Sequence, residues 1–309
     1  MNFEEVAIKT QNLSRCFGER VAVNNLNIEI KKGGIFSLLG TNGAGKTTTI
    51  KMLSCLLKPT SGSASVMDFN LAEHSQKIKN IIGVSPQETA IAAHLNSMEN
   101  LMLMGGVSGL KNGESKKRAI ELMALLGIEN RKDQARKLSG GLQRRLSIAM
   151  ALMCDPQILF LDEPTLGLDP HARKMVWDYI EKLKTKKTIL LTTHYLEEAD
   201  SLADTIAIMD EGKIIEMGTS ETLKKKYNAK QTMEVSSTNI SQLLTEQLQQ
   251  KGYEVVRTTK GLEVSATTID FYAVVGLLKQ NDVQISGIEM KEPTLDDVFL
   301  HLTNKEGKL

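Results

Sequence analysis

The sequence contains few cysteines and no long apolar run. Its three cysteines, Cys16, Cys55 and Cys154, are odd in number, and no two of them stand in a C-x-x-C spacing. We therefore expect small buried apolar side chains of a reducing compartment rather than disulfides or metal ligands. No stretch approaches the roughly 18 apolar residues that a membrane span requires. The N-terminal residues MNFEE also lack the basic and apolar regions of a signal peptide, so we expect a cytoplasmic chain.

Nor does the sequence have an excess of charge of either sign. It has 38 Lys and Arg against 37 Asp and Glu, for a net charge of +1. This balance argues against a dedicated nucleic-acid surface, although a local basic patch is compatible with it. Apolar residues make up 41% of the 309 residues, which is the composition of an ordinary globular protein. A chain of this length holds either one large and one small domain or two medium ones.

The sequence does contain a phosphate-binding pattern. Residues 40–48 read GTNGAGKTT and match G-x-x-x-x-G-K-[ST]. The apolar run 35–39 before them and the helix-like stretch 49–57 after them predict a strand, a tight glycine loop and a helix N-terminus. In this arrangement loop N–H groups and the helix dipole hold phosphate oxygens, Lys46 reaches the β- and γ-phosphates, and Thr47 ligates Mg²⁺. The alternative is a glycine turn that only caps a helix, which the surrounding pattern disfavours.

Two further polar motifs lie at the ends of predicted elements. Gln87 follows the apolar run 81–86, and a polar residue just past a parallel strand lies where α/β folds hold their ligands. Taken alone, Gln87 fits a solvated loop amide better. Ser139, Gly140 and Gly141 open a predicted helix, with Ser139 as N-cap and approachable backbone N–H groups. This motif is either a second phosphate cradle or merely a well-capped helix.

Carboxylates and a histidine follow two other buried strands. Asp162 and Glu163 end the apolar strand 158–161 and point to opposite sides, because strand side chains alternate. One of them can serve Mg²⁺ while the other faces a water molecule. His194 follows the strand 188–193 at the same predicted edge, within reach of a γ-phosphate, although most lone histidines are structural. Phe17, in a turn predicted at residues 16–19, favours a core position by its place alone, with stacking on an adenine ring as the alternative.

The remaining residues up to about position 225 predict two additions to the α/β core. Residues 6–13 and 21–30 alternate apolar and polar side chains, as half-buried antiparallel strands do. Residues 94–135 have helical spacing, and we expect glycines, Gly105-Gly106 among them, to break this stretch into a helical insert with loops.

A second, smaller domain is predicted after the nucleotide-binding core closes near residues 222–227. Strand and helix patterns between residues 233 and 290 follow the order β-α-β-β-α-β, which indicates a ferredoxin-like α+β arrangement. A last helix is predicted at residues 294–303.

Together and in this order, the motifs resemble those of the ATP-binding cassette (ABC) ATPases, the nucleotide-binding subunits of ABC transporters. The resemblance covers residues 6 to about 225 and implies a RecA-like P-loop α/β core with an antiparallel β subdomain and a helical subdomain. It implies catalytic roles for Glu163, His194 and Gln87, and Mg²⁺ ligation by Thr47, Gln87 and Asp162. The residues that it assigns to ATP are Phe17, Gly40, Thr41, Asn42, Gly43, Ala44, Gly45, Lys46, Thr47, Thr48, Ser139, Gly140 and Gly141.

One departure from the commonest pattern of the family narrows the resemblance. The signature LSGGQ has Leu142 at its fifth position here, with glutamine only at Gln143. This is similar to the variant SGG-x-x-R-R of drug-export and polysaccharide-export ATPases. The stretch EPTLDDVFLHL at residues 292–302 is also similar to the tail of ATPases paired with ABC-2 type membrane subunits, including daunorubicin-resistance-like exporters. The resemblance therefore implies export.

The resemblance also implies an assembly. We expect a cassette at residues 1–225, with its helical subdomain at about 88–150, and an accessory domain at 226–309. Two cassettes would form a head-to-tail homodimer around ATP and Mg²⁺, on the cytoplasmic face of the membrane. Because the chain shows no membrane span of its own, transport would require a separate ABC-2 type permease. We expect this permease to contact the region 87–131.

Two other classes of protein remain as alternatives. A soluble ABC protein that acts on ribosomes or DNA usually carries two cassettes or a long coiled coil, whereas this sequence shows one cassette, no long heptad run and no basic excess. A regulatory GTPase is less compatible still, because no N-K-x-D guanine motif is present.

Overall fold

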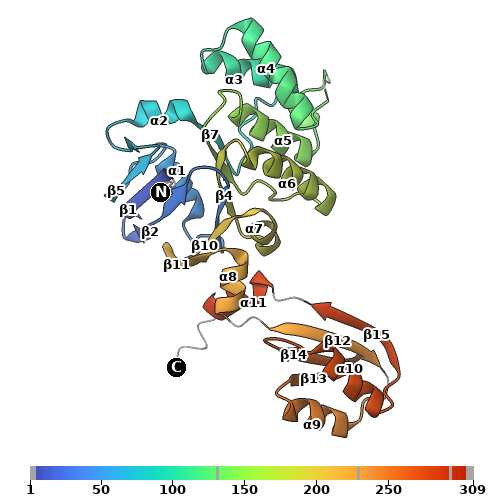
Figure 1. The fold of residues 1–309 in the computed structure, drawn as a ribbon. Coiled ribbons are helices and arrows are strands. Elements are labelled where there is room, and N and C mark those ends of the chain that lie inside the picture. The colour runs from blue at the N-terminus through green and yellow to red at the C-terminus, as the bar shows by residue number, and fades with distance from the viewer. Residues whose placement is uncertain (1–4, 130–131, 228–229, 238, 292–293, 304–309) are drawn as a thin grey trace. The chain divides into compact units, whose positions relative to one another are not determined.

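The computed structural model describes residues 5–129, 132–227, 230–237, 239–291 and 294–303. The chain divides into two compact units, one up to Ser220 and one from Glu221 onward (Figure 1). The boundary expected after residue 225 falls in the same helix, α8 (Ser220–Lys226), as this division.

The first unit is built around a six-stranded sheet in the order β11-β10-β4-β9-β8-β7. Five of these strands are parallel, and β11 pairs antiparallel with β10 at one edge. All residues of β4, β8 and β9 are buried, as expected for parallel strands that are covered on both faces. The strands are β4 (Ile35–Gly40), β7 (Ile82–Ser85), β8 (Ile158–Asp162), β9 (Thr188–Thr193), β10 (Thr205–Asp210) and β11 (Lys213–Gly218).

Alternate side chains of the buried strands enter two separate cores. Leu159 and Leu161 of β8 join a core with helices on one face, whereas Ile158 and Phe160 join a core with α1 and a second sheet on the other. This period of two places the central sheet in the middle of a layered α/β unit. Besides those of the helical insert, the helices of this unit include α1 (Lys46–Leu53), α2 (Ser75–Ile81), α5 (Gly140–Ala151), α6 (Pro170–Lys184) and α7 (Leu196–Leu202).

The second sheet of this unit is antiparallel, in the order β2-β1-β5-β6, with β3 also paired to β1. Its first strand continues to Phe17, which pairs with Arg20, so the turn predicted at residues 16–19 contains only Gly18 and Glu19. Gly18 has a positive φ of 58°, which suits a tight two-residue hairpin. The strands are β1 (Val6–Phe17), β2 (Arg20–Leu26), β3 (Glu29–Lys31), β5 (Ser61–Val66) and β6 (Phe69–Asn70).

The helical insert contains α3 (Ser97–Val107) and α4 (Asn112–Leu125), followed by a 3₁₀ turn at Ala135–Lys137. The prediction that Gly105-Gly106 breaks this stretch is wrong, because both glycines lie inside α3. A Cβ at Gly105 would lie 1.9 Å from the Ser115 hydroxyl of α4. Gly105 therefore permits two helices to approach closely, where the sequence pattern indicated a loop.

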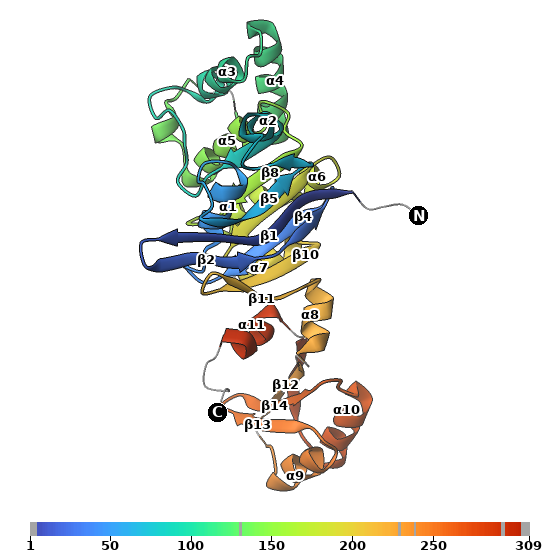
Figure 2. The same cartoon turned by 90° about the vertical axis from the view of Figure 1, so that its left-hand side faces the viewer.

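The second unit contains a four-stranded antiparallel sheet in the order β13-β14-β12-β15. Two helices, α9 and α10, pack on one face of this sheet around a shared apolar core (Figure 2). The elements follow the order β-α-β-β-α-β, and the ferredoxin-like assignment stays a prediction. They are β12 (Gln231–Ser237), α9 (Gln242–Gln250), β13 (Glu254–Thr258), β14 (Gly261–Ala266), α10 (Phe271–Gln280), β15 (Ile285–Lys291) and a last helix α11 (Leu295–Thr303).

Two expectations from composition can be compared with the described residues. The three cysteines are free, but each is half-buried rather than fully buried. Within the ranges that the structure describes, no helix combines the length and the apolar character that crossing a membrane would take.

A close contact between β7 and α5 leads to a first prediction. A Cβ at Gly83 would lie 2.2 Å from the Ala151 carbonyl oxygen and 2.9 Å from Pro156. We expect Gly83→Ala to lower the free energy of unfolding by about 1–3 kcal/mol, as overpacking does, measured by chemical denaturation. The control is Gly106→Ala in α3, where a Cβ would have no neighbour within 4 Å. There the exchange should stabilise by about 0.4–1 kcal/mol, and equal effects at both positions would contradict the packing argument.

Candidate active site

The loop between β4 and α1 has a conformation that only glycines can supply. Gly43 and Gly45 have φ values of 87° and 107°. A Cβ at Gly40 would lie 2.2 Å from the Met209 carbonyl oxygen, and one at Gly45 would lie 2.4 Å from that of Ala22. The helix α1 begins at Lys46, earlier than the sequence pattern indicates. Its first N–H groups therefore open directly onto the loop, as in phosphate-binding sites.

Lys46 lies at the centre of this arrangement. Its Nζ donates to the carbonyl oxygens of Gly40 at 2.8 Å and Thr41 at 3.1 Å. The same Nζ lies 3.1 Å from Oε1 of Glu163, and both side chains are 5% exposed. A buried cation and anion of this kind are stable only as a pair or against a charged ligand.

Glu163 is held in a strained backbone conformation just after β8. Its φ is +49°, in the left-handed region that non-glycine residues seldom adopt. The backbone N–H of Glu163 donates to both the carbonyl and the hydroxyl oxygen of Thr192, each at 3.1 Å. Oε2 of Glu163 lies 2.8 Å from Nδ1 of His194, which follows β9. Such strain costs about 1–3 kcal/mol and is concentrated at functional sites, here directing the carboxylate toward Lys46 and His194.

Asp162 faces a different set of partners, as the alternation of strand side chains predicts. Its Oδ1 accepts from the Thr47 hydroxyl at 3.0 Å and from the Thr192 hydroxyl at 2.6 Å. Among the residues that the structure describes, no three His, Cys, Asp or Glu side chains cluster as a metal site. Thr47 and Asp162 nevertheless fit Mg²⁺, which takes few protein ligands and completes its shell with phosphate and water oxygens.

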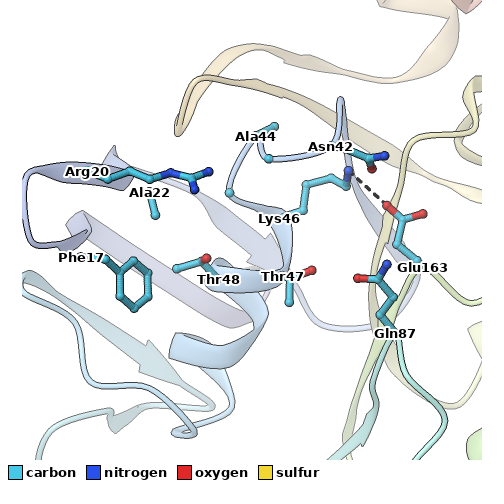
Figure 3. A pocket seen from close by; sticks show the side chains of 12 residues that line it. Phe17, Arg20, Ala22, Asn42, Ala44, Lys46, Thr47, Thr48, Gln87 and Glu163 are labelled. Atoms are coloured by element: carbon cyan, nitrogen blue, oxygen red, sulfur yellow. Dashed lines mark ion pairs between the residues drawn. The ribbon is translucent and has the colours of Figure 1, made fainter.

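A cavity of about 410 Å³ joins most of the predicted site (Figure 3). Phe17 and Arg20 lie at one end, and Gln87 and Glu163 at the other (Figure 3). Phe17 is 48% exposed and its ring lies 4.6 Å from the Arg15 guanidinium, so it does not belong to the core. The lining residues are Phe17, Arg20, Ala22, Asn42, Gly43, Ala44, Gly45, Lys46, Thr47, Thr48, Gln87 and Glu163.

Arg20 is a lining residue that the sequence reasoning missed. It pairs with Phe17 across the β1–β2 hairpin, and its Nη2 would lie 3.8 Å from a Cβ at Gly43. The only hint in the sequence is that Arg20 directly follows the turn predicted at residues 16–19, which contains Phe17. A cation here extends the positive lining of the cavity beyond Lys46.

The motif at Ser139, Gly140 and Gly141 lies outside this cavity. Ser139 caps α5, and its hydroxyl accepts from the Leu142 N–H at 3.4 Å. Ser139 and Gly140 are exposed and Gly141 is half-buried, with Leu168 and Ala172 as the nearest neighbours of a Cβ built on the two glycines. The structure thus brings together residues 40–48, Gln87 and Glu163, but not this second helix N-terminus.

The fold and the site define a P-loop nucleotide-binding protein with an added antiparallel sheet and helical insert. A family model described as "ABC transporter" matches residues 23–166. The linearmycin resistance ATP-binding protein LnrL of Bacillus subtilis is 34% identical, over 96% of this chain and 98% of that protein. The daunorubicin/doxorubicin resistance ATP-binding protein DrrA of Streptomyces peucetius is 35% identical, over 96% and 92%. The Nod factor export ATP-binding protein I of Sinorhizobium fredii is 35% identical, over 98% and 88%.

This chain therefore belongs to the ATP-binding proteins of ABC transporters, a family that binds ATP, in general with Mg²⁺, and hydrolyses it. A solved dimer of the cassette MJ0796 in a post-hydrolysis state with ADP and Pi has a TM-score of 0.64 and 28% identity. It covers 69% of this chain and 98% of its own. These findings confirm the predicted cassette fold and ATPase class, and none of them supports the ribosome or DNA alternative.

A buried carboxyl group behind the site generates a prediction about pH. Glu198 of α7 is fully buried and its Oε1 accepts from the Thr165 hydroxyl at 2.7 Å and the Trp177 indole at 2.9 Å. Burial raises the pKa of Glu198, against the effect of its hydrogen-bond donors. Its contribution to stability is therefore complete below the unfolded-state pKa and lost as pH rises through the folded-state pKa.

We expect Glu198→Gln to remove this pH dependence. Thermal unfolding can be followed by the fluorescence of the single tryptophan, Trp177. The melting temperature of Glu198→Gln should exceed that of the unmodified chain, and the difference should grow with pH. Glu197→Gln, at the exposed neighbouring position, is the matched control. A margin that shrinks with rising pH would contradict the assignment.

Proposed function

We propose that this chain is the ATP-hydrolysing subunit of an ABC-2 type exporter and works as a homodimer with two ATP molecules between its cassettes. The observation that carries the proposal is the joined set Lys46, Glu163 and His194 at the edge of the cavity. The printed names of the relatives, which concern linearmycin resistance, daunorubicin resistance and Nod factor export, support an export direction.

The proposed roles follow from the contacts of each residue. Glu163 accepts a proton from the attacking water, and His194 holds and orients its carboxylate through the 2.8 Å contact. Lys46 turns from the main-chain oxygens of Gly40 and Thr41 to the phosphates. Thr47 and Asp162 would hold Mg²⁺, which would supply positive charge beside the phosphates. Gln87, on the lining of the cavity, senses the γ-phosphate and completes the metal shell.

The dimer is supported by the separation of the two helix N-termini. Residues 42–48 line the cavity, whereas Ser139 and Gly140 are exposed outside it. A second copy can present Ser139 to Gly141 to the phosphates held by Lys46. Charge-assisted hydrogen bonds of about 1.5–3 kcal/mol each, several per γ-phosphate, are enough to bias an open–closed equilibrium.

The permease is proposed to dock on a groove beside the helical insert. This groove has a volume of about 670 Å³ and includes Pro86, Met104, Val107 and Met150 in its lining. Val107 is 74% exposed and Leu103 of the same helix is 48% exposed, so α3 presents more than one apolar side chain to solvent. The groove adjoins Gln87 in sequence, so a partner seated there lies close to the ATP sensor.

Glu163→Gln tests the catalytic proposal. The amide cannot accept the proton of water, so we expect ATP binding to persist while turnover falls by about 10²-fold or more. ATP should then accumulate a stable dimer, measured by light scattering coupled to gel filtration. Lys46→Ala is the control, because it should lose nucleotide binding and dimer together. Hydrolysis at the normal rate by Glu163→Gln would refute the role of this carboxylate.

Co-purification tests the transport proposal. The tagged chain, expressed in its native host and extracted with mild detergent, should carry a membrane protein whose sequence has about six apolar runs of about 20 residues. Recovery of ribosomes in place of such a protein would favour the soluble alternative.

A further inference from the structure

Helix α5 and strand β7 contact each other at three successive levels. The Gly83 backbone lies against the Ala151 carbonyl, where a Cβ would be 2.2 Å from the oxygen. The hydroxyls of Ser85 and Ser147 form a hydrogen bond of 2.9 Å. At the third level, Arg144 meets the carbonyl oxygens that follow the strand. The period of two along β7 thus matches the i, i+3, i+7 face of α5.

The third level is a buried arginine with two short bonds to main chain. Nη1 of Arg144 donates to the Pro86 carbonyl and Nη2 to the Gln87 carbonyl, both at 2.7 Å, and the residue is 4% exposed. An ordinary amide bond to carbonyl is about 2.9–3.0 Å, so these bonds are charge-assisted. The planar fork of arginine suits two adjacent acceptors, which one ammonium cannot match.

Nearby carboxylates offset the positive charge of Arg144. Burial lowers the pKa of the Arg144 guanidinium, and the carboxylates of Asp162, Glu198 and Glu163 raise it. Two of these three carboxylates belong to the candidate active site. A buried guanidinium is costly if it serves packing alone, which favours a positional role for Arg144.

The two carbonyls determine where the Gln87 side chain can go. Because β7 fixes the backbone before Pro86 and Arg144 holds the carbonyl of Gln87, the main chain that carries the Gln87 amide beside the cavity is held on both sides. The same arginine lies in the second turn of α5, the helix that begins at Ser139 to Gly141. One side chain therefore links the residue facing this chain's cavity to the motif outside it.

We propose that Arg144 is a positioning residue that couples Gln87 to the N-terminus of α5, so that a shift of either one moves the other. The inference rests on the proposed function, in which Gln87 contacts one ATP and the Ser139 motif contacts the other. Arg144 then connects the two nucleotide sites of the dimer within each chain, and it touches neither nucleotide.

The neighbouring Arg145 provides a matched control. It also bonds two carbonyl oxygens, those of Leu126 at 3.1 Å and Gly127 at 3.0 Å, and its guanidinium lies 5.9 Å from the Tyr179 ring. These acceptors directly follow α4 and are not part of the segment around Gln87. A replacement of Arg145 therefore removes a comparable structural contact without releasing Gln87.

The test compares Arg144→Lys with Arg145→Lys in steady-state ATP hydrolysis. We expect Arg144→Lys to lower kcat by about tenfold or more, since a small misplacement of a reacting group is costly. ADP affinity should stay within about threefold, and the Hill coefficient for ATP should fall toward 1. Arg145→Lys should leave kcat and the Hill coefficient within about twofold. Equal effects of the two replacements on turnover would overturn the proposal.

A double-mutant cycle with Gln87→Ala decides whether Arg144 acts through Gln87. If it does, Arg144→Lys causes no more than about a twofold further loss of kcat in the Gln87→Ala background. Losses that multiply in full would show an independent role and overturn the proposal. Should Arg144→Lys fail to fold, Arg144→Gln removes the buried charge and enters the same cycle.

Hydrogen exchange separates this proposal from the proposed function. In the nucleotide-free chain, amides of residues 85–92 should exchange faster in Arg144→Lys than in Arg145→Lys. Unchanged exchange there would overturn the positioning role even if turnover fell. Absence of ATP hydrolysis by the unmodified chain would refute the proposed function. The exchange comparison would still decide whether Arg144 holds the segment around Gln87.

Discussion

A chain of polar contacts, from Lys46 through Glu163 to His194, is the feature on which the rest of the site depends. Lys46 and Glu163 are buried, and isolated charges are costly to bury, so a rigid framework must bring these side chains to one place. Parallel pairing of β4, β8 and β9 provides it, because their carboxyl ends lie along one edge of the sheet. Thr192 reinforces the arrangement by bonding the Glu163 backbone and the Asp162 carboxylate together. The site is therefore positioned by backbone hydrogen bonding rather than by the loops alone.

The second phosphate cradle gives this framework its functional meaning. One helix N-terminus opens into the cavity at Lys46, and the other is exposed at Ser139 and Gly140. A family in which solved cassettes form dimers offers a reason for that separation. In the proposed assembly, the N-terminus of α5 presents Ser139 to Gly141 to the second copy. Arg144 of the same helix holds the main chain at Pro86 and Gln87 beside the cavity. The position of Gln87 at the site of hydrolysis and the position of the α5 N-terminus then depend on each other.

Local patterns predicted most of the fold and the main residues of the site. The glycine spacing at residues 40–48, the apolar strands 35–39, 158–161 and 188–193, and the polar residues after them each depend on short-range chemistry. The errors occurred where distant segments meet. The sequence pattern predicts a helix break at Gly105. It does not show that Gly105 faces Ser115 of another helix, where a larger side chain would not fit. Position alone favours a core place for Phe17, which is wrong, because the β1–β2 hairpin that exposes it beside Arg20 depends on strand pairing.

The sequence by itself determined the chemistry: a phosphate loop, a lysine, two carboxylates and a histidine in an order that identifies the family. Residue types and short spacings are sufficient for this, because the groups that bind phosphate and metal are few. Only the tertiary structure decided which of these groups share a cavity and what supports them. Arg20 and Glu198 belong to no motif that single-sequence reasoning recognises, and the pattern SGG-x-x-R-R that contains Arg144 does not reveal what Arg144 bonds, since the partners lie elsewhere in the chain. Long-range packing of strands and helices creates those contacts, and with them the positions on which the proposed catalysis relies.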